Sequence, residues 1–164
     1  MEPEMTQTFD APEMAQSQTR DEVAIPEGDW QQLWFVLQGT PWSALAVLPA
    51  DAGIDVRGVA EALVDIGQKS GAADVTLVNG VGARFNEVQS LVDRIEAAKR
   101  RGVQVVVACE PLEDSPAMLA LTRVATGTLL VVRLGQSRFS AVRKTVEAVG
   151  RDRVITSVTL KPRK

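Results

Sequence analysis

Four short segments hold the residues of this chain that are placed to do chemistry. They follow apolar runs and precede helical patterns, at residues 49–55, 79–82, 109–114 and 135–137. If the apolar runs are strands of a parallel sheet, these segments meet at its carboxyl edge, beside helix N-termini with free backbone N–H groups. We therefore expect any anion or nucleotide site at this edge.

The residue types exclude several kinds of catalysis. The chain has no histidine, which removes the usual general base and any serine or cysteine triad of the common kind. A lone thiol without histidine is also a poor ligand set, so no metal site is expected. The acids Glu110, Glu113 and Asp114 should raise the pKa of Cys109, which favours a structural thiol over a nucleophile.

The alternation of short apolar runs with helical patterns predicts the fold. Near-continuous Val, Leu and Ile runs are typical of strands covered on both faces, and five occur, at residues 43–48, 74–78, 103–108, 128–134 and 154–160. Helices are expected between them at residues 56–69, 83–101, 116–126 and 138–149, the second burying Phe85, Val88, Val92, Ile95 and Ala98. Right-handed crossovers then predict a three-layer α/β/α sandwich with a five-stranded, mainly parallel sheet.

A further amphipathic helix is expected before the first strand. Pro26 and Asp29 are placed to start it and Gly39 to end it. Trp30, Trp34 and Trp42 lie in or just after this helix, where they either pack on the sheet or offer a surface to a partner. Packing is favoured, because large aromatic side chains usually supply core area.

The order of these elements resembles that of the MinD and ParA-like P-loop ATPases, and especially the cytoplasmic kinase domain of bacterial tyrosine kinases, the polysaccharide co-polymerases. Residues 105–116, VVVACEPLEDSP, resemble the Walker B strand of that family and the Asp-x-Pro-Pro segment after it. Residues 127–138 resemble its Asp-Gly-Val-Leu-Leu-Val-Val-Arg segment, and residues 150–160 its closing strand. The resemblance covers about residues 42–160 and implies the strand order 2-3-1-4-5, with 2-1-3-4-5 as the alternative.

The loop after the first strand departs from the family pattern. A Walker A loop needs glycine for close backbone approach, lysine for the β and γ phosphates, and serine or threonine for Mg²⁺. Here Gly53 remains, but Ile54 stands at the lysine position and Asp55 at the hydroxyl position. Asp55 would repel a triphosphate, whereas it would stabilise the helix as its N-cap.

Other loops lack the groups of a working relative as well. Ala108 stands where the family carries its Walker B aspartate, with Glu110 two residues further on. At the end of another strand, where the family usually has Asp-x-Asp, this chain has Val78-Asn79-Gly80. The closing strand ends at Leu160 without the base-contacting Asn, and the chain contains no tyrosine, so tyrosine autophosphorylation is impossible in it. These losses remove the charge neutralisation on which phosphoryl transfer depends.

One loop remains as a candidate anion site. Gly80 and Gly82 precede a helix, and Arg84 follows them. Their backbone N–H groups either form a small nest for an anion or belong to a plain strand-to-helix turn, and the turn is favoured because a lone Gly-x-Gly carries little information.

Charge divides the chain into parts of opposite sign. Residues 1–29 hold eight acids and a single base, a net charge near −7, while residues 30–164 hold 13 acids and 17 bases, a net charge near +4. We expect a disordered acidic tail at residues 1–26, one α/β domain at residues 27–160, and a basic end at residues 161–164. No apolar stretch approaches the roughly 18 residues of a membrane-spanning helix, which favours a cytoplasmic protein.

The basic residues gather in the last third of the chain. Arg138, Arg143 and Lys144 are, with the tryptophans, the candidate interface residues, and Arg133, Arg151 and Arg153 lie in the same third. Such a patch suits a protein partner or an anionic surface. Nucleic acid is not expected, because no recognition helix or stacking motif accompanies the patch.

Three functions are compatible with the sequence. The leading hypothesis is a non-catalytic scaffold or regulator on a degenerate P-loop ATPase fold, without a cofactor, that binds a protein partner or a second copy of itself. One alternative is a nucleotide- or anion-binding sensor or ATPase that uses the backbone N–H groups of the Gly53 and Gly80 loops. The other is a flavodoxin-like or receiver-like interaction module, which the strand order would reveal.

Overall fold

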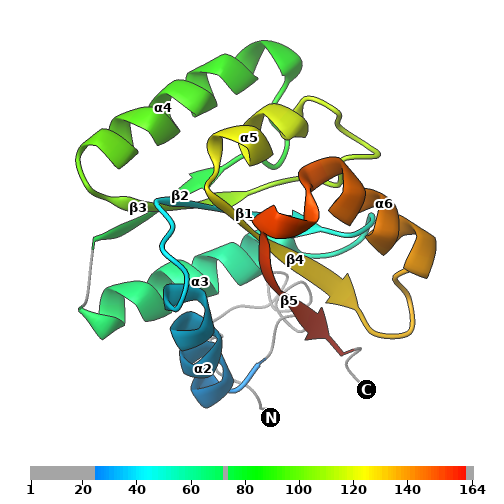
Figure 1. Ribbon diagram of the computed structural model, residues 1–164, viewed down its shortest axis with the longest axis horizontal. Coiled ribbons are helices and arrows are strands. Elements are labelled where there is room, and N and C mark those ends of the chain that lie inside the picture. The colour runs from blue at the N-terminus through cyan, green and yellow to red at the C-terminus, as the bar shows by residue number, and fades with distance from the viewer. Residues whose placement is uncertain (1–24, 72–73, 162–164) are drawn as a thin grey trace, which may run out of the picture.

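A sheet of five parallel strands forms the centre of the computed structural model, which describes residues 25–71 and 74–161 (Figure 1). The strands are β1 (Ala44–Pro49), β2 (Val75–Asn79), β3 (Gln104–Ala108), β4 (Gly127–Arg133) and β5 (Val154–Leu160). Their order is β2-β3-β1-β4-β5, and every neighbouring pair is parallel. The predicted fold class and strand order are confirmed, and the flavodoxin-like alternative order is wrong.

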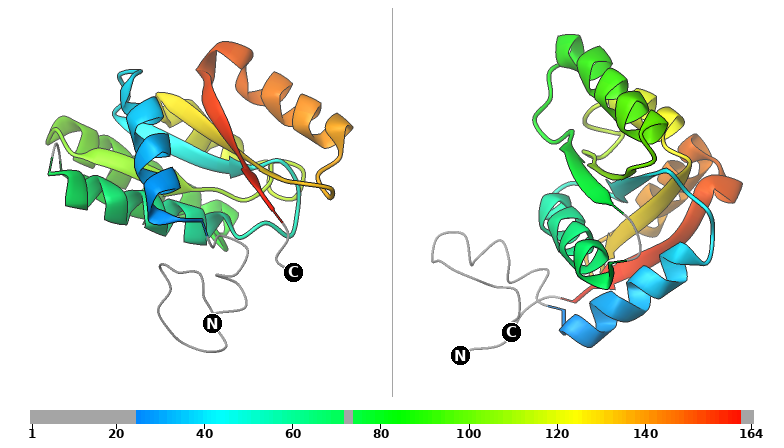
Figure 2. Two further views of the ribbon diagram at one scale, coloured as in Figure 1. Left: turned by 90° about the horizontal axis from the view of Figure 1, so that it is seen from below. Right: turned by 90° about the vertical axis from the view of Figure 1, so that its left-hand side faces the viewer.

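Helices cover both faces of the sheet. They are α2 (Glu27–Gln38), α3 (Val56–Ser70), α4 (Val88–Arg100), α5 (Met118–Val124) and α6 (Phe139–Val149), with short 3-10 turns η2 (Phe85–Glu87) and η3 (Arg151–Arg153). One core cluster packs α2 and α3 on one face, and a second packs α4 and α5 on the other, as the right-hand view of Figure 2 shows. Within the described ranges, none of these helices has the length and apolarity needed to cross a bilayer.

The predicted helix over residues 83–101 needs a correction at its start. Residues 85–87 form the 3-10 turn η2, and the α-helix begins only at Val88. The Glu87 carboxylate accepts a hydrogen bond from the Arg84 N–H at 2.7 Å, which tightens this turn and changes the helical phase. Phe85, predicted on the buried face, is therefore 85% exposed.

The other predicted bounds are close to those observed. Most strand ends differ by one residue, and β5 covers the predicted residues. The helix predicted over residues 116–126 is shorter, because Ala125 is already extended and the Thr126 N–H donates to the Ala44 carbonyl of the sheet. The predictions for residues 1–24 and 162–164, most of the acidic tail and most of the basic end, lie outside the described residues.

The three tryptophans belong to the core. All are buried in the cluster formed by α2, α3 and the sheet, with Trp34 and Trp42 in edge-to-face contact at 5.9 Å between ring centres. The Trp42 indole N–H donates to the Leu37 carbonyl, which ties the end of α2 to the start of β1. Packing is thus the correct alternative, and these side chains do not offer a partner surface.

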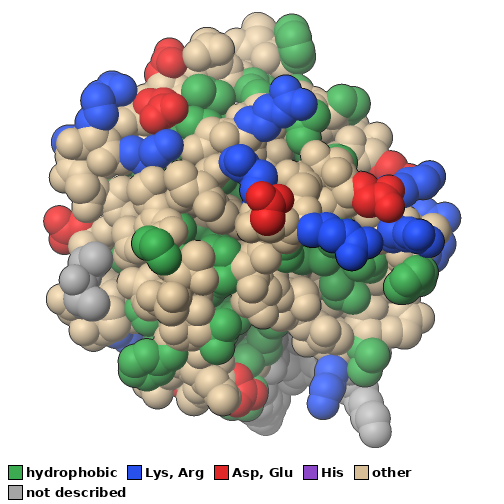
Figure 3. All heavy atoms as spheres, in the orientation of Figure 1, with side chains coloured by type: hydrophobic (Ala, Val, Ile, Leu, Met, Phe, Trp, Pro, Cys, Tyr) green, Lys and Arg blue, Asp and Glu red, His purple; other side chains and the backbone are tan. Residues whose placement is uncertain are grey.

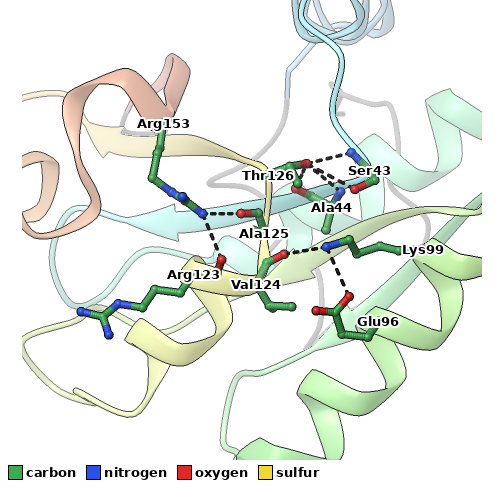
Figure 4. A network of polar contacts seen from close by, with 9 residues as sticks. All are labelled: Ser43, Ala44, Glu96, Lys99, Arg123, Val124, Ala125, Thr126 and Arg153. Atoms are coloured by element: carbon green, nitrogen blue, oxygen red, sulfur yellow. Dashed lines mark hydrogen bonds and ion pairs between the residues drawn. The ribbon is translucent and has the colours of Figure 1, made fainter.

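Two cations close the C-terminal end of α5, as Figure 4 shows. The Arg153 guanidinium donates to the carbonyl oxygens of Thr122, Arg123 and Ala125, and the Lys99 ammonium donates to that of Val124. The last carbonyl groups of a helix lack partners within it and carry partial negative charge. Arg153 therefore stabilises the fold and is not available to the basic surface to which the sequence assigned it.

We predict that Arg153→Met lowers the free energy of unfolding by about 1–3 kcal/mol, because three carbonyl groups lose a charged donor. Urea denaturation followed by circular dichroism measures this change. Arg151→Met is the matched control, because Arg151 is exposed on the same 3-10 turn, and its effect should stay within about 0.5 kcal/mol. Equal effects of the two substitutions would contradict the assigned role.

Candidate functional site

The sequence-predicted site residues meet at the carboxyl edge of the sheet. Gly53 and Asp55 follow β1, while Gly80, Gly82 and Arg84 follow β2. Ala108 ends β3 and Glu110 follows it, and Arg138 precedes α6. Because the strands are all parallel, these loops leave the same edge, which we call the carboxyl edge.

In the loop after β1, a carboxylate stands at the helix N-terminus. Gly53 has a φ of +88°, a backbone conformation that favours glycine. Asp55 is the N-cap of α3, and its carboxylate accepts from the Gly58 N–H at 3.1 Å. Ile54 is partly buried and packs against the core instead of reaching toward a ligand. The predicted N-cap role of Asp55 is confirmed, and it occupies the place where a helix could hold an anion.

A second carboxylate links this loop to the loop after β4. Asp51 accepts from the Ser137 hydroxyl at 3.1 Å and from the Arg138 N–H at 3.4 Å, at the N-terminus of α6. The Arg133 guanidinium donates to the Gly53 carbonyl and to the Gln136 side chain. Two loops that are separated by about half of the chain are thus held together by polar side chains of the protein itself.

The candidate anion loop after β2 uses its N–H groups internally. The Gly80 N–H donates to the Ala108 carbonyl at 2.7 Å, and a Cβ at Gly80 would lie 2.7 Å from that oxygen, so the close approach requires glycine. The Gly82 N–H donates to the Glu110 carboxylate at 2.9 Å. Arg84 lies beside Glu87, 3.8 Å away. In the described geometry, Glu110 occupies the place that an anion would need.

Cys109 lies directly at the end of β3 and is fully buried. Burial, and secondly the charge of Glu110, raise the pKa of the thiol to about 12. The predicted direction is confirmed, but desolvation outweighs the neighbouring acids that the sequence suggested as the cause. Across the described ranges, no three acidic, cysteine or histidine side chains gather as a metal site would require.

The predicted interface residues on α6 are exposed. The side chains of Arg138 and Arg143 lie near Glu113 and Glu147, at 4.0 and 3.5 Å, and Lys144 is also exposed. Arg133, by contrast, is bound to the loop after β1. The basic group that the sequence indicated therefore divides into surface residues on α6 and residues that hold the fold together.

Sequence reasoning missed Asp51 and Ser137 as partners. They are 86 residues apart, and each reads as an ordinary polar loop residue. Also missed was the exposure of large apolar side chains at the carboxyl edge, namely Val81, Phe85, Leu134 and Phe139. Phe139 is the first residue of α6. Whether its side chain is buried depends on how the helix is rotated against the sheet, which the sequence does not specify.

The chain is similar in structure to solved proteins. The kinase domain of the Escherichia coli tyrosine kinase ETK superposes with a TM-score of 0.63 and 13% sequence identity, over 80% of this chain and 73% of that chain. No protein-family model matches the chain, and no curated protein matches it. At this identity the likeness shows the fold alone: this chain shares the overall fold of that kinase domain.

We predict that Asp51→Ala destabilises the protein by about 1–2 kcal/mol, because the Ser137 hydroxyl and the N–H of Arg138, directly before α6, lose their acceptor. Urea denaturation measures the change. Asp114→Ala is the control, since Asp114 is an exposed loop residue at the same edge, and no effect above about 0.5 kcal/mol is expected there. An unchanged stability of Asp51→Ala would remove the proposed link between the loops.

Cys109 should be inert in the folded protein. A pKa of about 12 instead of 9.0 lowers the thiolate fraction at pH 8 by about 1000-fold, and burial further blocks the reagent. Titration with Ellman's reagent should show no reaction in buffer and one thiol per chain in denaturant. Reaction of the native protein at the rate of free cysteine would refute a buried thiol.

Proposed function

We propose that this chain is a non-catalytic scaffold or regulatory protein that uses a P-loop kinase-type fold to bind a protein partner. The observation that carries the proposal is that carboxylates occupy the carboxyl edge. Its loop after β1 has no lysine, and the carboxylates of Asp51, Asp55 and Glu110 accept hydrogen bonds from backbone N–H groups at this edge. Phosphoryl transfer needs cations at those places, to neutralise the phosphates.

Exposed apolar residues support the binding of a protein at the same edge. Six large hydrophobic side chains are exposed among the described residues. Four of them lie in or beside the loops after β2 and β4, namely Val81, Phe85, Leu134 and Phe139. The remaining two, Phe35 and Val36, lie on α2. The phosphates of a nucleotide gain nothing from such side chains and a base could stack on only one or two of them, whereas a protein surface can bury all four.

The alternative of a nucleotide or anion sensor finds its donors in the loop after β2 already engaged. The N–H groups of Gly80 and Gly82 donate to Ala108 and Glu110. An anion at this loop would have to displace Glu110, and an anion at the loop after β1 would meet the carboxylates of Asp51 and Asp55. No observation specifically favours this alternative, and the same experiment tests both.

We predict that isothermal titration of the full chain with ATP and Mg²⁺ gives no saturable heat up to about millimolar nucleotide, where a binding free energy is only about −4 kcal/mol. Phosphate release should equal that of buffer. Micromolar binding would overturn the non-catalytic proposal, and hydrolysis above background that is lost in Asp55→Lys would establish an enzyme.

A further inference from the structure

Two apolar side chains stand exposed beside the N-terminus of α6. Phe139, the first residue of the helix, is 78% exposed, and Leu134, just after β4, is 51% exposed. The Leu134 N–H donates to the Leu160 carbonyl at 2.8 Å, which brings the end of β5 and Lys161 beside Leu134. Burying a side chain of this size is favourable by about 1.5–3 kcal/mol, so these residues are ready to contribute to binding.

Cations lie near these apolar side chains along the chain. Arg143 lies one turn further along α6 than Phe139 on the same face, Lys144 follows it on the exposed side of the helix, and Arg138 directly precedes Phe139. The ion pairs of Arg138 and Arg143 are long and more than half exposed, so they hold these side chains weakly. Lys144 and Lys161 have no ion pair with another residue of the described ranges. We call Leu134, Arg138, Phe139, Arg143, Lys144 and Lys161 the α6 basic surface.

The charge of this region is unbalanced. Residues 127–161 contain seven bases and two acids, and five bases remain for the surface once Arg133 and Arg153 are set aside, because these two donate to carbonyl groups. Figure 3 shows Lys and Arg side chains gathered over α6, with hydrophobic side chains beside them. Such a concentration of one sign attracts a partner of the opposite sign and increases its association rate.

We propose that the α6 basic surface docks an acidic peptide segment of a protein partner, with an apolar side chain of that segment packing against Phe139 and Leu134. The proposal rests on the proposed function, since it names the chemistry of the partner and the part of the carboxyl edge that receives it. Carboxylates of the segment pair with Arg138, Arg143, Lys144 and Lys161. Charge complementarity selects the segment, and the apolar contact fixes its register.

A peptide fits this surface better than a lipid bilayer does. A helix that lies in a membrane surface presents a long apolar face, but the apolar face of α6, with Ala141, Thr145 and Val149, is buried against the protein. Glu147 also lies among the cations, 3.5 Å from Arg143, where it would repel anionic headgroups. A peptide can place its acids between such residues, whereas a uniformly anionic surface cannot.

Fluorescence anisotropy tests the proposal with the full chain. The probe is a short fluorescein-labelled peptide of Glu and Asp residues around a central Phe-Leu pair, and the control peptide has Ser-Ser in place of that pair. We expect micromolar binding of the probe at low salt and at least about tenfold weaker binding of the control peptide. Binding should largely disappear near 1 M salt, where the Debye length is about 3 Å.

Matched variants separate this surface from the rest of the molecule. The affinity for the probe should fall by at least about tenfold in Phe139→Ser, and also in the double variant Arg143→Glu with Lys144→Glu. Phe35→Ser is the apolar control, because Phe35 on α2 is 77% exposed, and Arg94→Glu on α4 is the charge control. Neither control should change the affinity by more than about twofold. Circular dichroism melts verify that all variants are folded.

Several results would overturn the docking proposal. They are the absence of probe binding at low salt, equal effects of Phe139→Ser and Phe35→Ser, and binding of phosphatidylserine vesicles that the probe does not displace. A Phe139-dependent dimer that ignores the probe would assign the surface to a second copy of the chain instead. ATP binding in the earlier titration would refute the non-catalytic proposal without changing these results, so the two failures are distinguishable.

Discussion

The burial of strand β1 is the constraint on which the rest of the structure depends. All six of its residues are buried, and it lies between β3 and β4 with a parallel neighbour on each side. Buried backbone groups must be hydrogen-bonded, so a central strand of this kind requires the full ladder. A parallel ladder in turn requires that the loops after β1 to β4 leave one edge and that helices cross back over the faces.

The backbone N–H groups of the loops at that edge then need hydrogen-bond acceptors. In P-loop ATPases the N–H groups of such loops hold the phosphates of a nucleotide. In this chain Asp51, Asp55 and Glu110 accept from them, and Arg133 joins two of the loops. The same contacts hold the loops together through groups of the protein itself.

Large apolar side chains are exposed at the same edge. The core takes the three tryptophans, whereas Phe35, Phe85 and Phe139 stand in solvent, the last two at the carboxyl edge. Beside Phe139 the cations of α6 remain on the surface, while Arg133 and Arg153 turn to carbonyl groups. The fold thus separates structural from surface cations within one basic segment.

The sequence by itself determined the fold class, and its resemblance to a known family supplied the strand order. Near-continuous Val, Leu and Ile runs alternating with helical patterns are typical of a parallel sheet covered by helices, and Asp55 is recognisable as an N-cap because capping acts over three residues. Only the tertiary structure decided which groups fill the carboxyl edge. The contacts of Asp51 with Ser137 and of Glu110 with Gly82 join residues far apart along the chain, and no local pattern encodes them. The exposure of Phe85 was likewise decided by a turn, since one 3-10 turn rotates a side chain from the predicted core face into solvent.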